Sequence, residues 1–277
     1  MNHEKKHAGK PSEDRRWMQY YPEMMLKMIQ IPDCTVWEYL EQHCPGPDVV
    51  AIHYYGEDIT WKTVFEESEK CARSLRAMGF GEGDQIPIFF RLVPNFVFLL
   101  LAAEKIGASL LCRDNTLIEN VEAVSRADAK AIFAHDFLSQ KELRTYCEGA
   151  GVKKVILLNP LYYGHESTLP DYIKASLDEN YPRVTASGEN TMTWDEFLKI
   201  GDYYVGKVEA DKDINRPLFR AYTSGSTGPA LSCHICSSFY VVPCLHKRFH
   251  RPVQTGHPLC EQYPWYRMSD ELLWRLR

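Results

Sequence analysis

Glycines and hydroxyl residues gather at 220–229, which reads RAYTSGSTGP and follows the strand-like residues 217–219. Its glycines allow backbone conformations that are closed to other residues, and its Ser and Thr hydroxyls add hydrogen-bond donors without bulk. Successive peptide N–H groups at the end of a strand attract anions, and phosphate is the commonest biological candidate. Such clusters are also typical of plain turns, so composition by itself leaves both interpretations open.

A family resemblance favours phosphate. Residues 222–228, YTSGSTG, resemble the signature phosphate loop of the adenylate-forming superfamily, which includes acyl-CoA synthetases, luciferases and peptide-synthetase adenylation domains. Upstream segments resemble the N-terminal landmarks of acyl-CoA synthetases in the same order, namely ITW at 59–61, GEGDQIPI at 81–88, PNF at 94–96 and AAEKIGA at 102–108. The resemblance covers roughly residues 30–230.

The resemblance implies a ligase reaction in two steps. ATP with Mg²⁺ would convert a small carboxylate into an acyl-adenylate and pyrophosphate, and coenzyme A would then displace AMP. Such reactions depend on positioning and charge neutralisation rather than on a protein nucleophile, so we assign no catalytic residue. The residues expected to cradle the β- and γ-phosphates are Thr223, Ser224, Gly225, Ser226, Thr227 and Gly228.

The sequence leaves the family pattern just after this loop. In the family the loop is usually followed by one residue and then by Pro-Lys-Gly, so the lysine position falls on Leu231 here. A missing cation removes a charge-assisted contact to the phosphates. We therefore expect this chain to form no acyl-adenylate. The absence of the family's later nucleotide-binding motifs and C-terminal domain supports the same expectation.

Two other enzyme patterns lack residues or flanking elements that they require. Residues 201–208 fit G-x-x-x-x-G-K, but Val208 stands where a P-loop needs Ser or Thr, and the residues before Gly201 predict a helix rather than a strand. Ser224 and Ser226 lack the G-x-S-x-G context of a serine nucleophile. Neither pattern predicts a function.

A zinc site is a further alternative. Cys233, Cys236, His246 and His250 offer two thiolates and two imidazoles, the donor set of a tetrahedral zinc site. The gap between Cys236 and His246 is shorter than the roughly twelve residues usual in zinc fingers, and no ββα pattern surrounds it. We therefore predict no metal ligand.

The elements around these motifs alternate in type. Beyond Gly79, strands are expected at 85–90, 109–112, 131–134 and 155–158, and helices at 94–105, 121–126, 138–147 and 194–200. Repeated β-α-β units imply right-handed crossovers and an α/β fold with a mostly parallel sheet flanked by helices. This fold resembles the N-terminal subdomain of acyl-CoA synthetases. Its ligands are expected at the carboxyl ends of the strands.

The residues before Gly79 predict smaller elements. Apolar spacing indicates helices at 24–29, at 36–43 with Thr35 as its cap, and at 64–78. Between the last two, the runs 49–55 and 59–61 predict a β-hairpin. A further helical patch is expected at 169–177.

Bulk composition is that of a folded globular protein. The 277 residues are 45% hydrophobic and 25% charged. A net charge of −5 gives no reason to expect nucleic acid or an anionic membrane as partner. The apolar run 96–103 is far short of the roughly 20 residues of a membrane-spanning helix, and the polar N-terminus is no secretory signal. We expect a cytoplasmic protein whose nine cysteines are reduced thiols.

Three segments are predicted. Residues 1–20 form a flexible N-terminus, 21–230 a partial AMP-binding domain, and 231–277 an irregular tail rich in Cys, His and Pro. The change of composition at the third segment indicates an interrupted reading frame. The predicted function is that of a truncated, inactive AMP-dependent synthetase or ligase, and the alternative is a non-catalytic nucleotide-binding or zinc-binding module. A parallel sheet cut before its last strands is expected to fold marginally.

Overall fold

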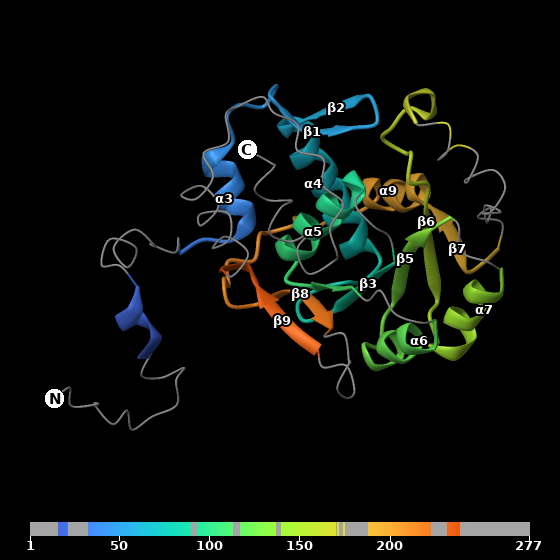
Figure 1. The fold of residues 1–277 in the computed structure, drawn as a ribbon. Coiled ribbons are helices and arrows are strands. Elements are labelled where there is room, and N and C mark those ends of the chain that lie inside the picture. Colours follow the sequence, from blue (N-terminus) through green and yellow to red (C-terminus); the bar gives the residue numbers. More distant parts are fainter. Residues whose placement is uncertain are drawn as a thin grey trace.

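A seven-stranded sheet forms the centre of the computed structural model (Figure 1). The structure describes residues 16–21, 33–89, 93–112, 117–136, 140–169, 171, 174, 188–222 and 232–238. In spatial order the strands are β7 (Thr191–Thr193), β6 (Lys154–Leu158), β5 (Ala131–His135), β3 (Gln85–Phe89), β4 (Ser109–Cys112), β8 (Pro217–Tyr222) and β9 (Ser232–Cys236). Neighbouring strands are parallel except β9, which runs antiparallel to β8.

Helices cover both faces of the sheet. Those on one face are α4 (Trp61–Ala77), α5 (Pro94–Lys105) and α9 (Trp194–Asp202), and those on the other are α6 (Leu117–Arg126) and α7 (Gln140–Gly149) (Figure 1). Two adjacent residues of β5 contact helices on opposite faces of the sheet, because successive side chains of a strand point in opposite directions. Phe133 packs edge-on against Trp194 and Phe197 of α9. Ile132 belongs instead to the apolar cluster of α6 and α7.

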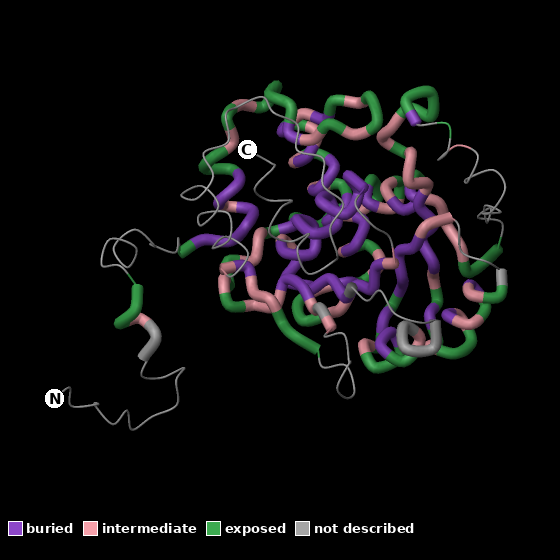
Figure 2. The backbone as a smooth tube through the Cα atoms, in the orientation of Figure 1, coloured by how far each residue is buried: buried purple, intermediate pink, exposed green. Residues whose placement is uncertain are grey.

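Helix α5 is buried on every side. All its residues from Pro94 to Glu104 are buried, as the continuous buried colouring at the centre of Figure 2 shows. It packs against α4, β4, β8 and the N-terminal helix α3 (Val36–His43), so no face of it needs polar side chains. This burial explains why its sequence is a nearly unbroken apolar run.

The N-terminal part builds a hairpin and a helix outside the main sheet. Helix α3 (Val36–His43) follows Thr35, which is its cap as predicted and which also forms a capping box with Glu38. Strands β1 (Val50–Tyr54) and β2 (Glu57–Thr60) form the predicted hairpin, with positive φ at Tyr55 and Gly56 in its turn. Short 3₁₀ helices occupy Arg16–Tyr20 and Glu166–Thr168.

The predicted mostly parallel α/β fold is confirmed, with differences at element ends. Trp61 begins α4 instead of ending a strand, because the Thr60 hydroxyl accepts a hydrogen bond from the Thr63 N–H and caps the helix. Gly79, with φ of 83°, follows the end of that helix as expected. The helix predicted at 24–29 and most of the patch at 169–177 lie outside the described residues.

Two strands, β7 and β9, have no counterpart in the sequence-based prediction. Strand β7 is only three residues long, and β9 falls at the start of the segment predicted to be an irregular tail. Strand β9 covers the side of β8 that β4 leaves open. None of the described helices has the length and apolar character that crossing a bilayer requires.

Candidate functional site

The carboxyl edge of the sheet is where the fold favours a ligand. Parallel strands end at the same edge, and the connections of β3 and β5 diverge there. Strand β3 leads through α5 to β4, whereas its neighbour β5 leads through α7 to β6. Open α/β sheets bind ligands where adjacent connections diverge in this way. Residues 223–231, which include the predicted phosphate-binding residues, leave from the same edge at the end of β8.

The two ends of segment 223–231 are held together by one rung of the sheet. Tyr222 at the end of β8 pairs with Ser232 at the start of β9. Directly opposite residues in an antiparallel ladder have Cα atoms about 5 Å apart. The segment therefore leaves and rejoins the sheet at the same place. Leu231 and the predicted ligand-binding residues lie outside the described residues, and these are Thr223, Ser224, Gly225, Ser226, Thr227 and Gly228.

Strand β8 is fixed on both sides before this segment begins. Leu110 of β4 pairs with Phe219, and β9 pairs along the other side. The Phe219 ring also meets the ring of Phe96 in the first turn of α5, at a centroid distance of 6.5 Å. The backbone that leads into the segment is thus placed by the most buried part of the fold.

Positive charge lies on the β8–β9 ladder. Arg220 of β8 stands directly opposite His234 of β9. Partial burial and the nearby Arg220 charge both lower the pKa of His234. Within the described parts of the chain, no carboxylate forms an ion pair with Arg220. A cation without an acidic partner favours an anion nearby. Sequence reasoning misses this pair because only the strand register brings His234 to Arg220.

The zinc alternative loses support on β9. Cys233 and Cys236 are three residues apart on this strand, so their side chains point to opposite faces. Cys233 is exposed, and the Cys236 sulfur lies 3.2 Å from the Ser238 hydroxyl oxygen. Across the described ranges, no three His, Cys, Asp or Glu side chains gather as metal ligands would. His246 and His250 lie outside these ranges.

The P-loop-like run 201–208 has a packing role at its start. Gly201 lies in the last turn of α9, where a Cβ would come within 2.6 Å of the Ser74 Oγ on α4. A P-loop would follow a strand instead. Arg73 donates hydrogen bonds to the carbonyls of Gly201 and Tyr204 and so holds this end of α9 against α4.

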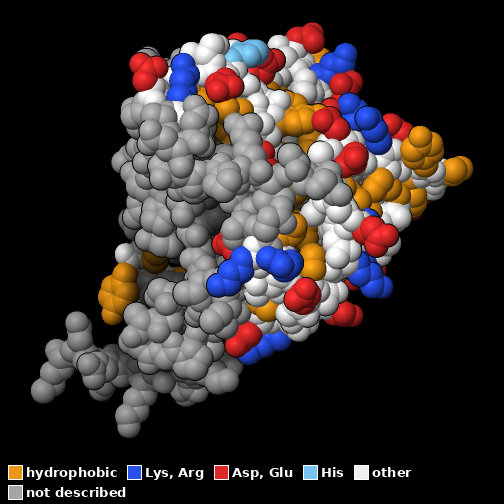
Figure 3. All heavy atoms as spheres, turned by 90° about the vertical axis from the view of Figure 1, so that its right-hand side faces the viewer, with side chains coloured by type: hydrophobic (Ala, Val, Ile, Leu, Met, Phe, Trp, Pro, Cys, Tyr) orange, Lys and Arg blue, Asp and Glu red, His pale blue; other side chains and the backbone are white. Residues whose placement is uncertain are grey.

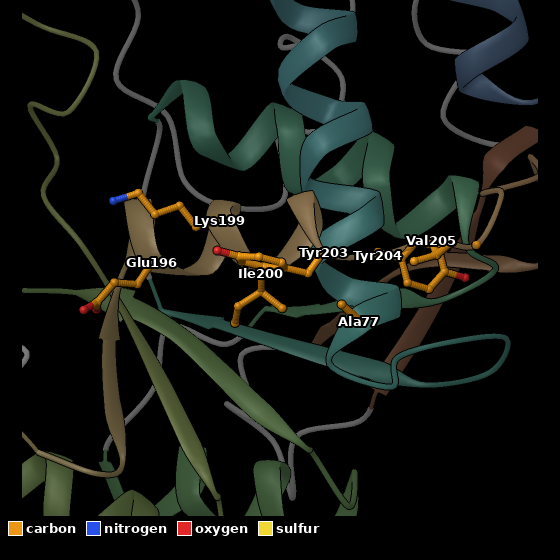
Figure 4. Close-up of a pocket in the computed structure, with 8 residues that line it drawn as sticks. Ala77, Glu196, Lys199, Ile200, Tyr203, Tyr204 and Val205 are labelled. Atoms are coloured by element: carbon orange, nitrogen blue, oxygen red, sulfur yellow. The ribbon is translucent and has the colours of Figure 1, made fainter.

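A groove of about 610 Å³ lies beside this helix end (Figure 4). Its lining is mostly apolar, with Glu196 and Lys199 at one end and Tyr204 and Val205 at the other. Helix α4 contributes Ala77 and leads into the amino end of β3. The groove is therefore at the edge opposite to the one where segment 223–231 begins. Acidic and basic side chains are intermixed on the face seen in Figure 3.

Comparison with known proteins identifies the family of the chain. The sequence model of the AMP-binding enzyme family matches residues 40–230. The chain belongs to this family. It is 29% identical over 180 residues to the 3-hydroxypropionyl-coenzyme A synthetase of Metallosphaera sedula and 35% identical over 193 residues to an acetyl-coenzyme A synthetase of Pseudoalteromonas atlantica. The two alignments include 61% and 65% of this chain.

The fold has matches among solved structures. An anthranilate CoA ligase in complex with anthranoyl-AMP superposes with a TM-score of 0.57 at 13% identity, over 76% of this chain and 36% of that one. The acetoacetyl-CoA synthetase of Streptomyces lividans gives a TM-score of 0.56 at 16% identity, over 77% of this chain and 31% of that one. The sequence alignments cover 24% and 27% of the two synthetases named above, so the chain spans about a quarter of their length.

Proposed function

We propose that this chain binds MgATP at the carboxyl edge of its sheet through residues 223–228. The observation that carries the proposal is the Tyr222–Ser232 pair, which closes the ends of segment 223–231 at that edge. Membership of the AMP-binding enzyme family supports ATP as the ligand. The groups proposed to hold its β- and γ-phosphates are the peptide N–H groups and hydroxyls from Thr223 to Gly228, with Mg²⁺ sharing the charge.

Arg220 is proposed to assist at this site. The family places a lysine where this chain has Leu231, so the phosphates lose one cationic contact. Arg220 lies on the strand that enters the segment and has no acidic partner among the described residues. Its charge adds to the positive potential there without replacing the missing contact.

We further propose that the 277-residue chain binds MgATP without catalysing the reaction that follows. Relatives named as coenzyme A synthetases suggest a small carboxylate and coenzyme A as the substrates of a complete reaction. The lost cation at Leu231 supports the proposal that this chain does not itself form the acyl-adenylate. Its location is proposed to be the cytoplasm, because nine cysteines in this composition suit a reducing compartment.

Equilibrium dialysis with labelled MgATP tests the binding, and pyrophosphate exchange tests the absence of turnover. We expect saturable binding that is lost when Gly225 and Gly228 are both replaced by Val, because Cβ branches block the approach of the backbone to phosphate. We also expect no carboxylate-dependent exchange of labelled pyrophosphate into ATP above an enzyme-free blank. If the wild-type chain binds no MgATP, the proposed binding is contradicted. If it exchanges labelled pyrophosphate above the blank, the proposed absence of turnover is contradicted.

A further inference from the structure

A buried carboxylate joins three distant parts of the chain. Glu104, near the end of α5, accepts hydrogen bonds from the N–H groups of Val36 at 2.9 Å and Trp37 at 2.7 Å. The hydroxyl of Ser237 donates to the same carboxylate and accepts from the Val36 N–H at 2.8 Å. Glu104 is 7% exposed and Ser237 is 2% exposed. The cluster thus connects α5, the start of α3 and the residue that follows β9.

The hydrogen bonds at the start of α3 are fully accounted for. The first peptide N–H groups of a helix have no partner within the helix. At α3 those of Val36 and Trp37 go to Glu104, and that of Glu38 goes to the Thr35 hydroxyl. The carboxylate also lies at the positive end of the helix dipole. Burying a carboxylate is costly unless it is bonded in this way, so the position of Glu104 depends on the N–H donors of α3 and the hydroxyl of Ser237.

Strand β9 needs an attachment at this end. It lies at the sheet edge, and its neighbour within the described residues is β8. The ladder ends with Cys236 opposite Pro217, which has no N–H to donate. The register also shifts between Pro217 and Phe219. This end of β9 is fastened by the Ser237 hydroxyl to Glu104 and by the Ser238 N–H to the Ile214 carbonyl at 3.1 Å.

The junction has no room for a ligand of its own. The cavity beside Glu104 and Ser237 measures about 10 Å³, at the lower limit for a single water molecule. The side chains around it therefore act on one another and on the elements that carry them.

We propose that Glu104 is a positioning residue for the nucleotide segment, because it holds β9 and with it the downstream end of segment 223–231. Segment 223–231 rejoins the sheet at Ser232, the first residue of β9. Any displacement of β9 along β8 therefore moves that end relative to Tyr222. The consequence for nucleotide binding rests on the proposed function, whereas the attachment of β9 does not.

Three variants of the full chain separate this role from general stability. Glu104→Gln keeps the size but turns one accepting oxygen into a donor, so one of the α3 N–H groups faces another N–H. Ser237→Ala removes the hydroxyl that joins the end of β9 to Glu104 and to the Val36 N–H, and it stands in if the first variant does not fold. The matched control is Glu38→Gln, because Glu38 bonds to Thr35 at the same helix start.

Amide hydrogen exchange of residues 232–236 and the dissociation constant of MgATP are measured for each variant. We expect Glu104→Gln and Ser237→Ala to speed exchange in β9 relative to β3 by about tenfold or more and to weaken MgATP binding about tenfold. The control changes neither. All three retain cooperative melting.

Each outcome that differs from these expectations overturns a different part of the proposal. Equal exchange of β9 in Ser237→Ala and the Glu38→Gln control overturns the attachment. Faster exchange of β9 with unchanged MgATP affinity overturns the positioning role. If the wild-type chain binds no MgATP, the proposed function fails, and the exchange data still decide whether Glu104 holds β9.

Discussion

Gly201 of α9 lies against Ser74 of α4 with no space between them for a methyl group. A Cβ at Gly201 would stand 2.6 Å from Ser74 Oγ, 2.9 Å from Ser74 N and 3.0 Å from Lys70 O. Two of these atoms belong to the α4 backbone and cannot rotate away. The close contact between the two helices therefore requires glycine at this position.

Gly201→Ala is expected to destabilise the protein by about 1–3 kcal/mol, the usual cost of overpacking a core. Urea unfolding measures the change. Gly188→Ala is the matched control, because the nearest atom to a Cβ there is the Thr191 hydroxyl oxygen at 3.8 Å. Equal stability of the two variants would show that α4 and α9 are not packed as described.

Restoring the family's cation is expected to strengthen nucleotide binding. Leu231→Lys adds a charge-assisted contact to the phosphates, and MgATP affinity should rise about tenfold, since such contacts contribute about 1.5–3 kcal/mol. Dialysis with MgATP compares it with Leu231→Met, which adds length without charge. An equal rise in both variants would exclude a role for the charge.

Arg220→Gln is expected to weaken MgATP binding by about threefold to tenfold, because it removes the positive charge on the strand that enters segment 223–231. The loss should shrink at high salt, where such an interaction is screened. Lys199→Gln in the groove beside α9 is the control and should leave the affinity unchanged. An equal effect of both variants would mean that net charge, not position, sets the affinity.

The contribution of Glu104 to the free energy of unfolding is expected to fall as pH rises from about 4.5 to about 7. Burial raises its pKa from the ordinary value of 4.5 to about 7, although hydrogen bonds from Ser237, Trp37 and Val36 favour the charged form. The folded state then holds a proton that the unfolded state has released between these pH values. The stabilisation that this proton gives to the folded state is present in full below about pH 4.5 and is lost as pH rises through about 7. The unfolding free energy falls by at most about 1.4 kcal/mol per pH unit over this range.

The difference in unfolding free energy between wild type and Glu104→Gln measures this contribution. Comparison of the two chains cancels the titration of distant carboxylates. Charged groups around the junction include Glu38 on α3 and the cavity-lining Asp211, Asp213 and Arg216. The difference should fall as pH rises from 4.5 to 7. A flat or rising difference would contradict the assigned protonation.

Whether a feature of this structure could be predicted from the sequence depends on how far apart in the chain its contacting residues lie. Local signals suffice for the cap at Thr35 and the end of α4 at Gly79. They also suffice for the parallel core, because apolar runs separated by helices allow few other arrangements. The resemblance to acyl-CoA synthetases is confirmed by the family match over residues 40–230.

Long-range partners could not be predicted in the same way. In the sequence, Glu104 is a polar residue near the end of a mostly apolar helix, and only the fold brings it to Ser237 and Val36. His234 faces Arg220 only because of the β8–β9 register. The roles of residues 223–228 stay a prediction, since they rest on resemblance and lie outside the described residues.

Hydrogen exchange of the wild-type chain with and without MgATP locates the bound nucleotide on the fold. If nucleotide binds where β8 ends, MgATP should slow exchange in peptides that span residues 217–236 and leave peptides that span 199–206, at the groove beside α9, unchanged. Protection at the groove instead, or at neither place under saturating MgATP, would contradict the proposed site.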